Sequence, residues 1–176
     1  MKRILILVGA VVALASGAAV AVAGFNQNFG THLNGRNEVP QRDTNAQGQA
    51  IFHLSDDGQS MEYKLIVANI DNAFMAHIHI GPATGTGPIA VWLYPGTTPG
   101  VTAPLGQGRL DGVIAQGVFT AANFTGPLSG QPMSALVDAI ENDNAYVNVH
   151  TNDGVDGTNT GAGDFPGGEI RAQLVK

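Results

Sequence analysis

The sequence predicts an all-β, antiparallel β-sandwich or barrel with one short helix, and three observations support this fold class. Apolar and polar residues alternate through eight short runs, as they do where one face of a strand packs on a core. Turn-forming residues separate the runs, for example Asp56-Asp57-Gly58 and Pro95-Gly96. The chain contains no cysteine. Packing, backbone pairing or a bound metal, and not disulfides, must therefore hold the domain together.

The alternating runs give the expected strands, and one segment departs from them. We expect strands at Phe29–Asn34, Gln47–Leu54, Met61–Asn69, Phe74–Ile80, Ile89–Tyr94, Gly108–Gln116, Ala145–Thr151 and Glu169–Leu174. In Gln131–Asn142, by contrast, Met133, Leu136, Val137 and Ile140 recur at helical spacing, which predicts a short helix packed on the sheet. The polar, Gly-rich stretch 152–163 is expected to be a surface loop.

The N-terminus has the features of an export signal. Lys2 and Arg3 precede an uncharged run, residues 4–23, which closes with the small-x-small pattern Ala21-Val22-Ala23. We therefore expect residues 1–23 to be a signal peptide and residues 24–176 to be a single domain that is periplasmic or extracellular. The alternative is an uncleaved N-terminal membrane anchor, because a run of about 20 such residues is just long enough to span a bilayer.

The charge balance limits the partners. The whole chain has a formal charge of −6, and loss of Lys2 and Arg3 with the signal would leave −8. This balance argues against nucleic acid, and against a membrane surface as a partner once the signal is cleaved. A protein or polymer partner is expected instead, and the sequence leaves homo-oligomer formation open.

Three stretches, in order along the chain, carry a family resemblance. They are residues 33–40 (LNGRNEVP), residues 76–83 (AHIHIGPA) followed by Gly87-Pro88-Ile89, and residues 145–151 (AYVNVHT) together with 166–174 (PGGEIRAQL). Together they resemble the CHRD family, named for the repeats of chordin, over residues 29–174. Ala172 stands where the family usually has Gly, and the loop between Thr151 and Pro166 is longer than is usual there.

The resemblance implies a Greek-key β-sandwich of immunoglobulin-like or superoxide-dismutase-like type, and residues 24–176 would be one CHRD domain. Chordin is an extracellular protein that binds growth factors, so the resemblance favours an exported, non-catalytic binding protein with an extracellular or periplasmic partner. Nothing in the sequence marks a nucleophile with its base. The sequence therefore favours a binding role over a catalytic one, and no cofactor is assigned with certainty.

The histidines support an alternative function, metal binding. His77 and His79 lie two residues apart on a strand, so both side chains project from one face. His150 lies on a later strand, on the face opposite Val147 and Val149, and would supply a third nitrogen if the two strands came close. Three imidazoles without a thiolate suit copper or zinc, for storage, delivery or redox protection. The competing interpretation is that these are ordinary polar residues on the outer face of a sheet.

Other polar residues are candidates for supporting roles. Glu38, Asn148 and Glu169 could orient the imidazoles as second-shell partners. A structural role is the competing interpretation, in which Glu169 pairs with Arg171 as a cross-strand ion pair. The H-x-H strand is also similar to the copper site of copper–zinc superoxide dismutases. That less favoured enzymatic reading requires more metal histidines and normally a disulfide, whereas this chain has five histidines and no cysteine.

Overall fold

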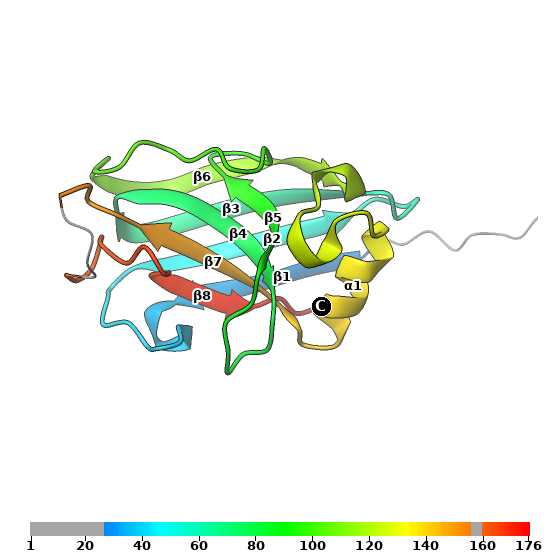
Figure 1. Ribbon diagram of the computed structural model, residues 1–176, viewed down its shortest axis with the longest axis horizontal. Coiled ribbons are helices and arrows are strands. Elements are labelled where there is room, and N and C mark those ends of the chain that lie inside the picture. The colour runs from blue at the N-terminus through cyan, green and yellow to red at the C-terminus, as the bar shows by residue number, and fades with distance from the viewer. Residues whose placement is uncertain (1–26, 156–159) are drawn as a thin grey trace, which may run out of the picture.

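The computed structural model describes residues 27–155 and 160–176. The predicted signal peptide, 1–23, lies outside the described residues, as do residues 156–159 of the predicted surface loop. The described chain forms β1 (Gln27–Asn34), β2 (Gln47–Leu54), β3 (Ser60–Asp71), β4 (Ala73–Ile80), β5 (Ile89–Tyr94), β6 (Arg109–Thr120), α1 (Met133–Glu141), β7 (Ala145–Thr151) and β8 (Ile170–Gln173), with short 3-10 helices at η1 (Gly35–Asn37), η2 (Ala121–Asn123) and η3 (Gly126–Leu128) (Figure 1).

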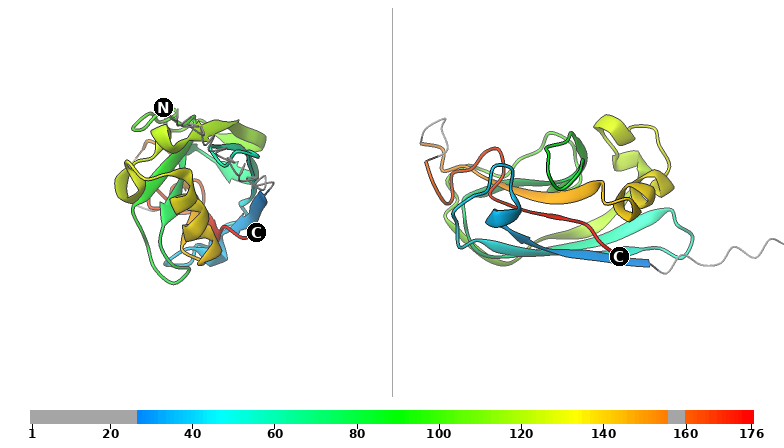
Figure 2. Two further views of the ribbon diagram at one scale, coloured as in Figure 1. Left: turned by 90° about the vertical axis from the view of Figure 1, so that its right-hand side faces the viewer. Right: turned by 90° about the horizontal axis from the view of Figure 1, so that it is seen from below.

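The strands form one antiparallel sheet that rolls up on itself. Its strand order is β5-β4-β7-β8-β1-β2-β3-β6. The two edge strands, β5 and β6, contact each other without forming a ladder within the described chain. Seen end on, the strands surround a common interior (Figure 2, left). The predicted all-β antiparallel fold with one short helix is therefore confirmed, in the form of a nearly closed barrel or sandwich.

The predicted strand positions agree well with the observed ones, and β6 differs most. The bounds of β2, β5 and β7 are those expected from the alternation. Strand β6 continues past its expected end at Gln116 to Thr120, and its pairing with β3 places the buried Phe119 opposite Met61. Gly117 interrupts the alternation in this strand, which explains why the sequence pattern ends too early.

Apolar side chains fill the interior of the barrel. The rings of Phe52, Tyr63 and Phe119 lie with their centroids 6.0–6.5 Å apart. The Tyr63 hydroxyl donates a hydrogen bond of 2.7 Å to the Leu93 carbonyl and so links β3 to β5. Buried aromatic rings of this kind, with the one polar group satisfied, account for much of the stability of a domain without disulfides.

The helix α1 confirms the predicted helical segment. Its buried residues, Met133, Leu136 and Ile140, join the apolar core, and Val137 packs partly against it. In the view from below, the helix lies toward one end of the barrel (Figure 2, right). None of the helices in residues 27–155 and 160–176 has the length and apolarity needed to cross a membrane.

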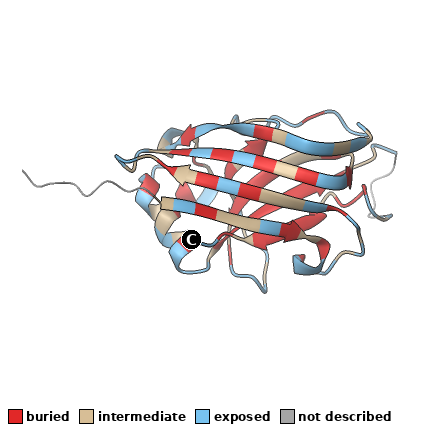
Figure 3. Cartoon of the chain, turned by 180° about the vertical axis from the view of Figure 1, so that it is seen from behind, coloured by how far each residue is buried: buried red, intermediate tan, exposed pale blue. Residues whose placement is uncertain are grey.

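The outward side of the sheet has two different regions. On β2 and β3 the outward residues are exposed or half-buried, so buried and exposed residues alternate along the strands nearest the viewer in Figure 3. On β7, however, all seven residues are buried. We call the outward side of β2, β3 and β6 the open face. The outward side of β4, β7 and β8 is the covered face, and its central side chains are His77, His79, Tyr146, Asn148, His150 and Arg171.

Two chain segments contribute to the covering of this second face. The loop between β4 and β5 places Gly87 against His79 and Tyr146, and it places Pro82 against Arg171. The segment that precedes β8 places Pro166 against His150. Polar side chains that strand alternation directs outward are consequently buried here beneath loops.

Candidate metal centre

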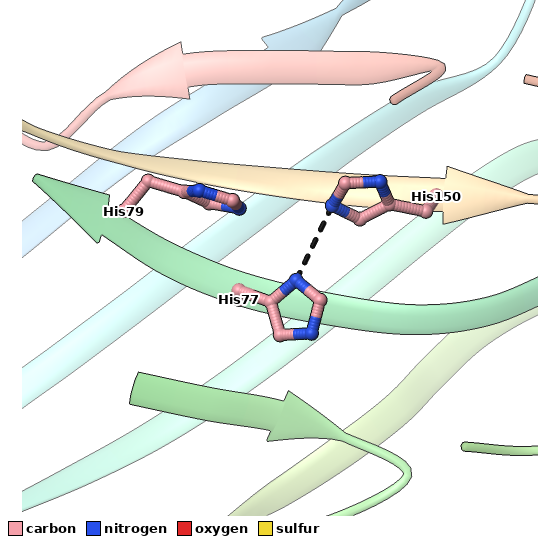
Figure 4. A group of neighbouring side chains, drawn as sticks. All are labelled: His77, His79 and His150. Carbon is pink, nitrogen blue, oxygen red and sulfur yellow. Dashed lines mark hydrogen bonds between the residues drawn. The ribbon is translucent and has the colours of Figure 1, made fainter. Parts of the chain in front are cut away.

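Strands β4 and β7 bring together all three histidines that the sequence singled out. His77 and His79 project from the same face of β4, as the two-residue period of a strand requires. In the antiparallel pairing of β4 with β7, His77 lies opposite Asn148, so His150 is its diagonal neighbour. Figure 4 shows the three rings gathered on one side of the two strands.

The spacing of the rings is close to that of a metal site. The centroid of the His77 ring lies 5.0 Å from that of His150 and 5.4 Å from that of His79. One nitrogen from each ring can be chosen so that all three lie within 4.8 Å of one another. His77 Nδ1 and His150 Nε2 are 3.2 Å apart. Two nitrogens bound to one tetrahedral ion at about 2.0–2.1 Å would be about 3.3 Å apart, so only His79 has to draw closer.

Backbone carbonyl groups determine the tautomers of two of the imidazoles. His79 Nδ1 lies 2.9 Å from the Gly87 carbonyl oxygen, and His150 Nδ1 lies 2.9 Å from the Pro166 carbonyl oxygen. A carbonyl oxygen can only accept, so each Nδ1 carries the hydrogen and each Nε2 keeps a free lone pair. Metal-binding histidines typically donate their other N–H to a carbonyl or carboxylate in this way.

Glycine at position 87 is what allows the loop to reach His79. A β-carbon at this position would lie 1.8 Å from the carbonyl oxygen of Ile80, which no side chain could tolerate without movement of the backbone. The Gly87 N–H also donates a 3.0 Å hydrogen bond to the Tyr146 hydroxyl. Because this glycine lies so close to β4, its carbonyl group can contact His79 and its N–H group can contact Tyr146.

The cluster contains lone pairs that have no partner. His150 Nε2 can accept from His77 Nδ1, which leaves His77 Nε2 as an acceptor without a donor. His79 Nε2 is likewise buried without a hydrogen-bond partner. A buried polar group left unsatisfied costs about 1–3 kcal/mol, so two such nitrogens side by side are an expensive feature of a folded protein. A cation held by His77 Nδ1, His150 Nε2 and His79 Nε2 would satisfy the lone pair of His79 and would replace the hydrogen bond between His77 and His150, with the hydrogen of His77 then on Nε2.

Burial keeps the imidazoles in the neutral form that binds metals. Desolvation, with the neighbouring His150 and His79 adding to it, lowers the pKa of His77 to about 2. Desolvation, together with the neighbouring His79, lowers the pKa of His150 to about 4. The pKa of His79 is lowered too, chiefly by burial. At neutral pH none of the three rings has to lose a proton before it binds a metal ion.

Aromatic residues flank the cluster. The Trp92 ring on β5 meets the His77 ring edge-on, with centroids 4.2 Å apart. The Tyr146 ring on β7 stacks on His79 with an interplanar angle of 5° and a centroid distance of 4.9 Å. From the side of β8, the Arg171 guanidinium carbon lies 3.5 Å from the centroid of the Tyr146 ring. These contacts limit the rotation of the imidazoles and exclude water from around them.

Asn148 and Glu38 lie together beside the cluster and do not bond to the imidazoles within the described chain. Asn148 is opposite His77 on the neighbouring strand, and its Oδ1 is buried without a partner. Glu38 Oε1 is also buried and unpartnered. Both side chains crowd Gly168, whose φ is +123° and where a β-carbon would lie 2.5 Å from Asn148 Nδ2 and 2.7 Å from Glu38 Oε1.

Glu169 has a different environment from the one expected. Its carboxylate accepts hydrogen bonds from the hydroxyls of Thr44 and Thr151 and from the Gly163 N–H, at 2.5, 2.6 and 2.9 Å. The expected ion pair with Arg171 is wrong: no nitrogen–oxygen contact within 4.0 Å joins the two among the described residues. Hydroxyl and backbone donors satisfy the carboxylate, and the guanidinium turns toward Tyr146.

The other histidines with described surroundings stay apart from the cluster. His53 lies half-buried on the open face, where its Nδ1 is 2.8 Å from Asn28 Oδ1. His32 is exposed on β1. Neither residue therefore contributes to the cluster.

Sequence reasoning missed the groups that complete the site. The carbonyls of Gly87 and Pro166 carry no side-chain signal, and Trp92 and Tyr146 look like ordinary strand residues. The one available signal was the run of glycines from Gly81 to Gly87, because closely spaced glycines indicate a close approach of backbones.

Comparison with known proteins identifies one family. The family model described as the CHRD domain matches residues 29–174, which is most of the chain. No curated protein and no solved structure matches the chain.

Proposed function

Since this chain belongs to the CHRD family and carries a buried three-histidine cluster, we propose that it binds one transition-metal ion through His77, His79 and His150. One observation carries the proposal. The lone pair of His79 Nε2 is buried without a partner beside the close pair of His77 Nδ1 and His150 Nε2, while backbone carbonyls hold the Nδ1–H groups of His79 and His150. A site built for hydrogen bonding alone would have supplied a donor to the lone pair of His79.

The ligand set favours copper or zinc. Three neutral imidazoles without a thiolate or carboxylate are suited to Zn(II) and Cu(II), and affinity for such a nitrogen site is expected to be higher for Cu(II). Among the described residues, His77, His79 and His150 are the only group of histidine, cysteine or carboxylate side chains close enough together to hold one ion. Asn148, opposite His77, is a candidate to supply an oxygen ligand, because its Oδ1 is buried and unpartnered.

This proposal makes metal handling the primary role, in place of the partner binding that the family resemblance first favoured. The N-terminal sequence supports a location outside the cytoplasm, and a protein there would store, deliver or sequester the ion. A dismutase role is not part of the proposal, because the cluster has three histidines and no second metal site accompanies it among the described residues.

The test combines metal analysis with fluorescence. The full chain, purified without an affinity tag, should contain copper or zinc in a ratio to protein near one, as measured by mass spectrometry. Trp92 is the only tryptophan and contacts His77, so its fluorescence reports on the site directly. Paramagnetic Cu(II) added to metal-free protein should quench this fluorescence, whereas closed-shell Zn(II) should not, and Zn(II) should compete with the quenching.

Matched variants give the control. His79→Gln should weaken Cu(II) binding by at least about a hundredfold, since loss of a ligand costs more than loss of an outer-shell partner. His53→Gln removes a histidine from the open face and should leave the affinity unchanged. The proposal fails if the metal-free protein takes up neither ion at micromolar concentration, or if the two variants bind Cu(II) equally.

A further inference from the structure

Arg171 is a buried cation that forms no salt bridge within the described chain. Its side chain is among the largest that are fully buried, with 1% of its surface exposed. One nitrogen, Nη2, donates a 2.8 Å hydrogen bond to the Pro82 carbonyl, and the guanidinium covers Tyr146. No carboxylate oxygen in residues 27–155 or 160–176 lies within 4.0 Å of its nitrogens. Buried charges in proteins are normally paired, so this guanidinium lacks the partner that its environment calls for.

A cavity of about 480 Å³ lies against this residue. Its lining includes Arg171 and the polar side chains of Arg36, Asn37, Glu38, Gln41 and Gln173. Arg36, Asn37 and Gln41 are exposed, so they form the mouth, whereas the buried Arg171 lies at the base. The volume is in the range of small-molecule sites, and the many amide and guanidinium groups suit a polar ligand.

The charges around the cavity are predominantly positive, although the protein as a whole carries −6. Arg36 and Arg171 contribute two guanidinium groups, and Glu38 contributes the one carboxyl group of the lining. Burial raises the pKa of Glu38 to about 7, against the opposing effect of Arg171, so much of its negative charge is absent at neutral pH. An anion entering the cavity would therefore meet a net positive field.

We propose that this cavity binds a small polar ligand bearing an oxyanion, whose negative group is held by Arg171 at the base and Arg36 at the mouth. The amide nitrogens of Asn37 and Gln173 already donate to backbone carbonyls, so their amide oxygens would accept from hydroxyl groups of the ligand, and the Gln41 amide would bond to the rest of it. A guanidinium binds carboxylate, sulfate and phosphate oxygens with two parallel hydrogen bonds, which is the interaction that Arg171 lacks. The inference does not depend on metal binding, because the cavity lining includes none of the three ligand histidines.

NMR titration of the metal-free full chain at pH 7 and low ionic strength tests this inference. The probes are glucuronate for a carboxylate, inorganic phosphate and sulfate for tetrahedral anions, and glucose as the uncharged control. At least one anion should bind saturably at concentrations up to about 10 mM and shift the backbone amides of Arg36, Asn37 and Arg171. Glucose should cause no such shifts. The probe that binds most tightly distinguishes a planar carboxylate from a tetrahedral anion.

Charge-matched variants decide whether the cavity is responsible. Arg36→Gln should weaken the binding of the preferred anion by about tenfold, because one charge-assisted contact is lost. Lys64→Gln removes the same charge from the exposed surface of β3 and should leave the affinity unchanged. Arg171→Lys keeps the charge but loses the two-pronged geometry, and should weaken binding further if it folds; if it does not fold, Arg36→Gln decides.

Three results would overturn the inference: no saturable binding of any anion, glucose binding as tightly as glucuronate, or equal weakening in Arg36→Gln and Lys64→Gln. The outcome of the anion titration is also independent of the outcome of the metal-binding test. Loss of Cu(II) binding in His79→Gln does not bear on the cavity, and loss of anion binding in Arg36→Gln does not bear on the imidazoles.

Discussion

An outward-facing histidine has different burial and different partners on the open and covered faces of the same sheet. On the open face, His53 stays half-buried and bonds to the neighbouring Asn28 side chain. On the covered face, His77 is fully buried, contacts Trp92 and His150, and retains a nitrogen without a partner. Both residues obey the same strand alternation, so the difference comes from the loops that lie over β4 and β7.

The comparison shows how an ordinary β-sheet surface becomes a chemical site. Solvent would satisfy any polar side chain on an open face, so such a residue carries little information about function. Beneath a covering loop, the same side chain must find a partner within the protein or with a ligand. The unpartnered nitrogens of His77 and His79 and the guanidinium of Arg171, which forms no salt bridge within the described chain, all lie on the covered face.

The largest effect expected from this difference is a dependence of stability on pH. Burial lowers the pKa of His77 to about 2 and that of His150 to about 4, from 6.5, and it lowers that of His79 too. Below pH 6.5 the unfolded chain takes up protons that the folded, metal-free chain does not. Each imidazole that stays neutral therefore reduces the free energy of unfolding by roughly 1 kcal/mol per pH unit as the pH falls toward 4.5.

Glu38 opposes this trend. Its pKa is raised from 4.5 to about 7, so the cost of its burial as an anion disappears as the pH falls through the same range. It offsets one imidazole, so His77 and His150 leave a net loss of stability of at least roughly 1 kcal/mol per pH unit, to which His79 adds; urea unfolding of metal-free protein measures it. His150→Gln should reduce this slope by roughly 1 kcal/mol per pH unit, whereas His53→Gln should preserve it. Equal slopes in all three proteins would show that the cluster is not neutral in the folded state.

The second effect concerns the loop that covers His79. In Gly87→Ala, the new methyl group would lie 1.8 Å from the Ile80 carbonyl oxygen, so the loop must move away from β4. We expect a loss of about 3 kcal/mol in the free energy of unfolding of the metal-free protein. Cu(II) affinity should fall at least about tenfold, because the carbonyl that orients His79 is displaced.

Gly96→Ala is the matched control for the loop. Gly96 lies in the turn after β5, and a β-carbon there would meet no atom within 4 Å. The free energy of unfolding of Gly96→Ala should differ from that of the unchanged protein by no more than about 0.5 kcal/mol. If Gly87→Ala were as stable as Gly96→Ala and bound Cu(II) as tightly, then the loop would not be what positions the imidazole.

The smallest effect is expected from the buried carboxyl group. Glu38→Gln removes the cost of burying a negative charge, so its effect on the free energy of unfolding should be more favourable at pH 8 than at pH 5 by roughly 2 kcal/mol. At pH 5 the native carboxyl is already protonated, so most of this advantage should be lost. Glu62→Gln, on the open face of β3, should have no measurable effect at either pH. A destabilisation by Glu38→Gln of the same size at both pH values would mean that its ionisation is not what matters.

The sequence by itself determined the local structure and two of the three histidines of the cluster. Alternation and turn residues predicted β2, β5 and β7 to the residue, and helical spacing predicted α1, because such periodicities are contained in residues a few positions apart. The H-x-H spacing placed His77 and His79 on one face for the same reason. His150 could be offered only as a candidate, since its distance from His77 depends on which strands pair and in which register.

Only the tertiary structure decided what the polar residues do. Pairing of β4 with β7 brought His150 within 3.2 Å of His77, and the two covering segments supplied the carbonyls that orient the rings. The same covering changed the partners of Glu169 and Arg171, which local spacing had paired with each other. Burial and hydrogen bonding depend on segments far apart in the chain, and a polar residue on a strand has the same sequence pattern whether water or a loop lies above it.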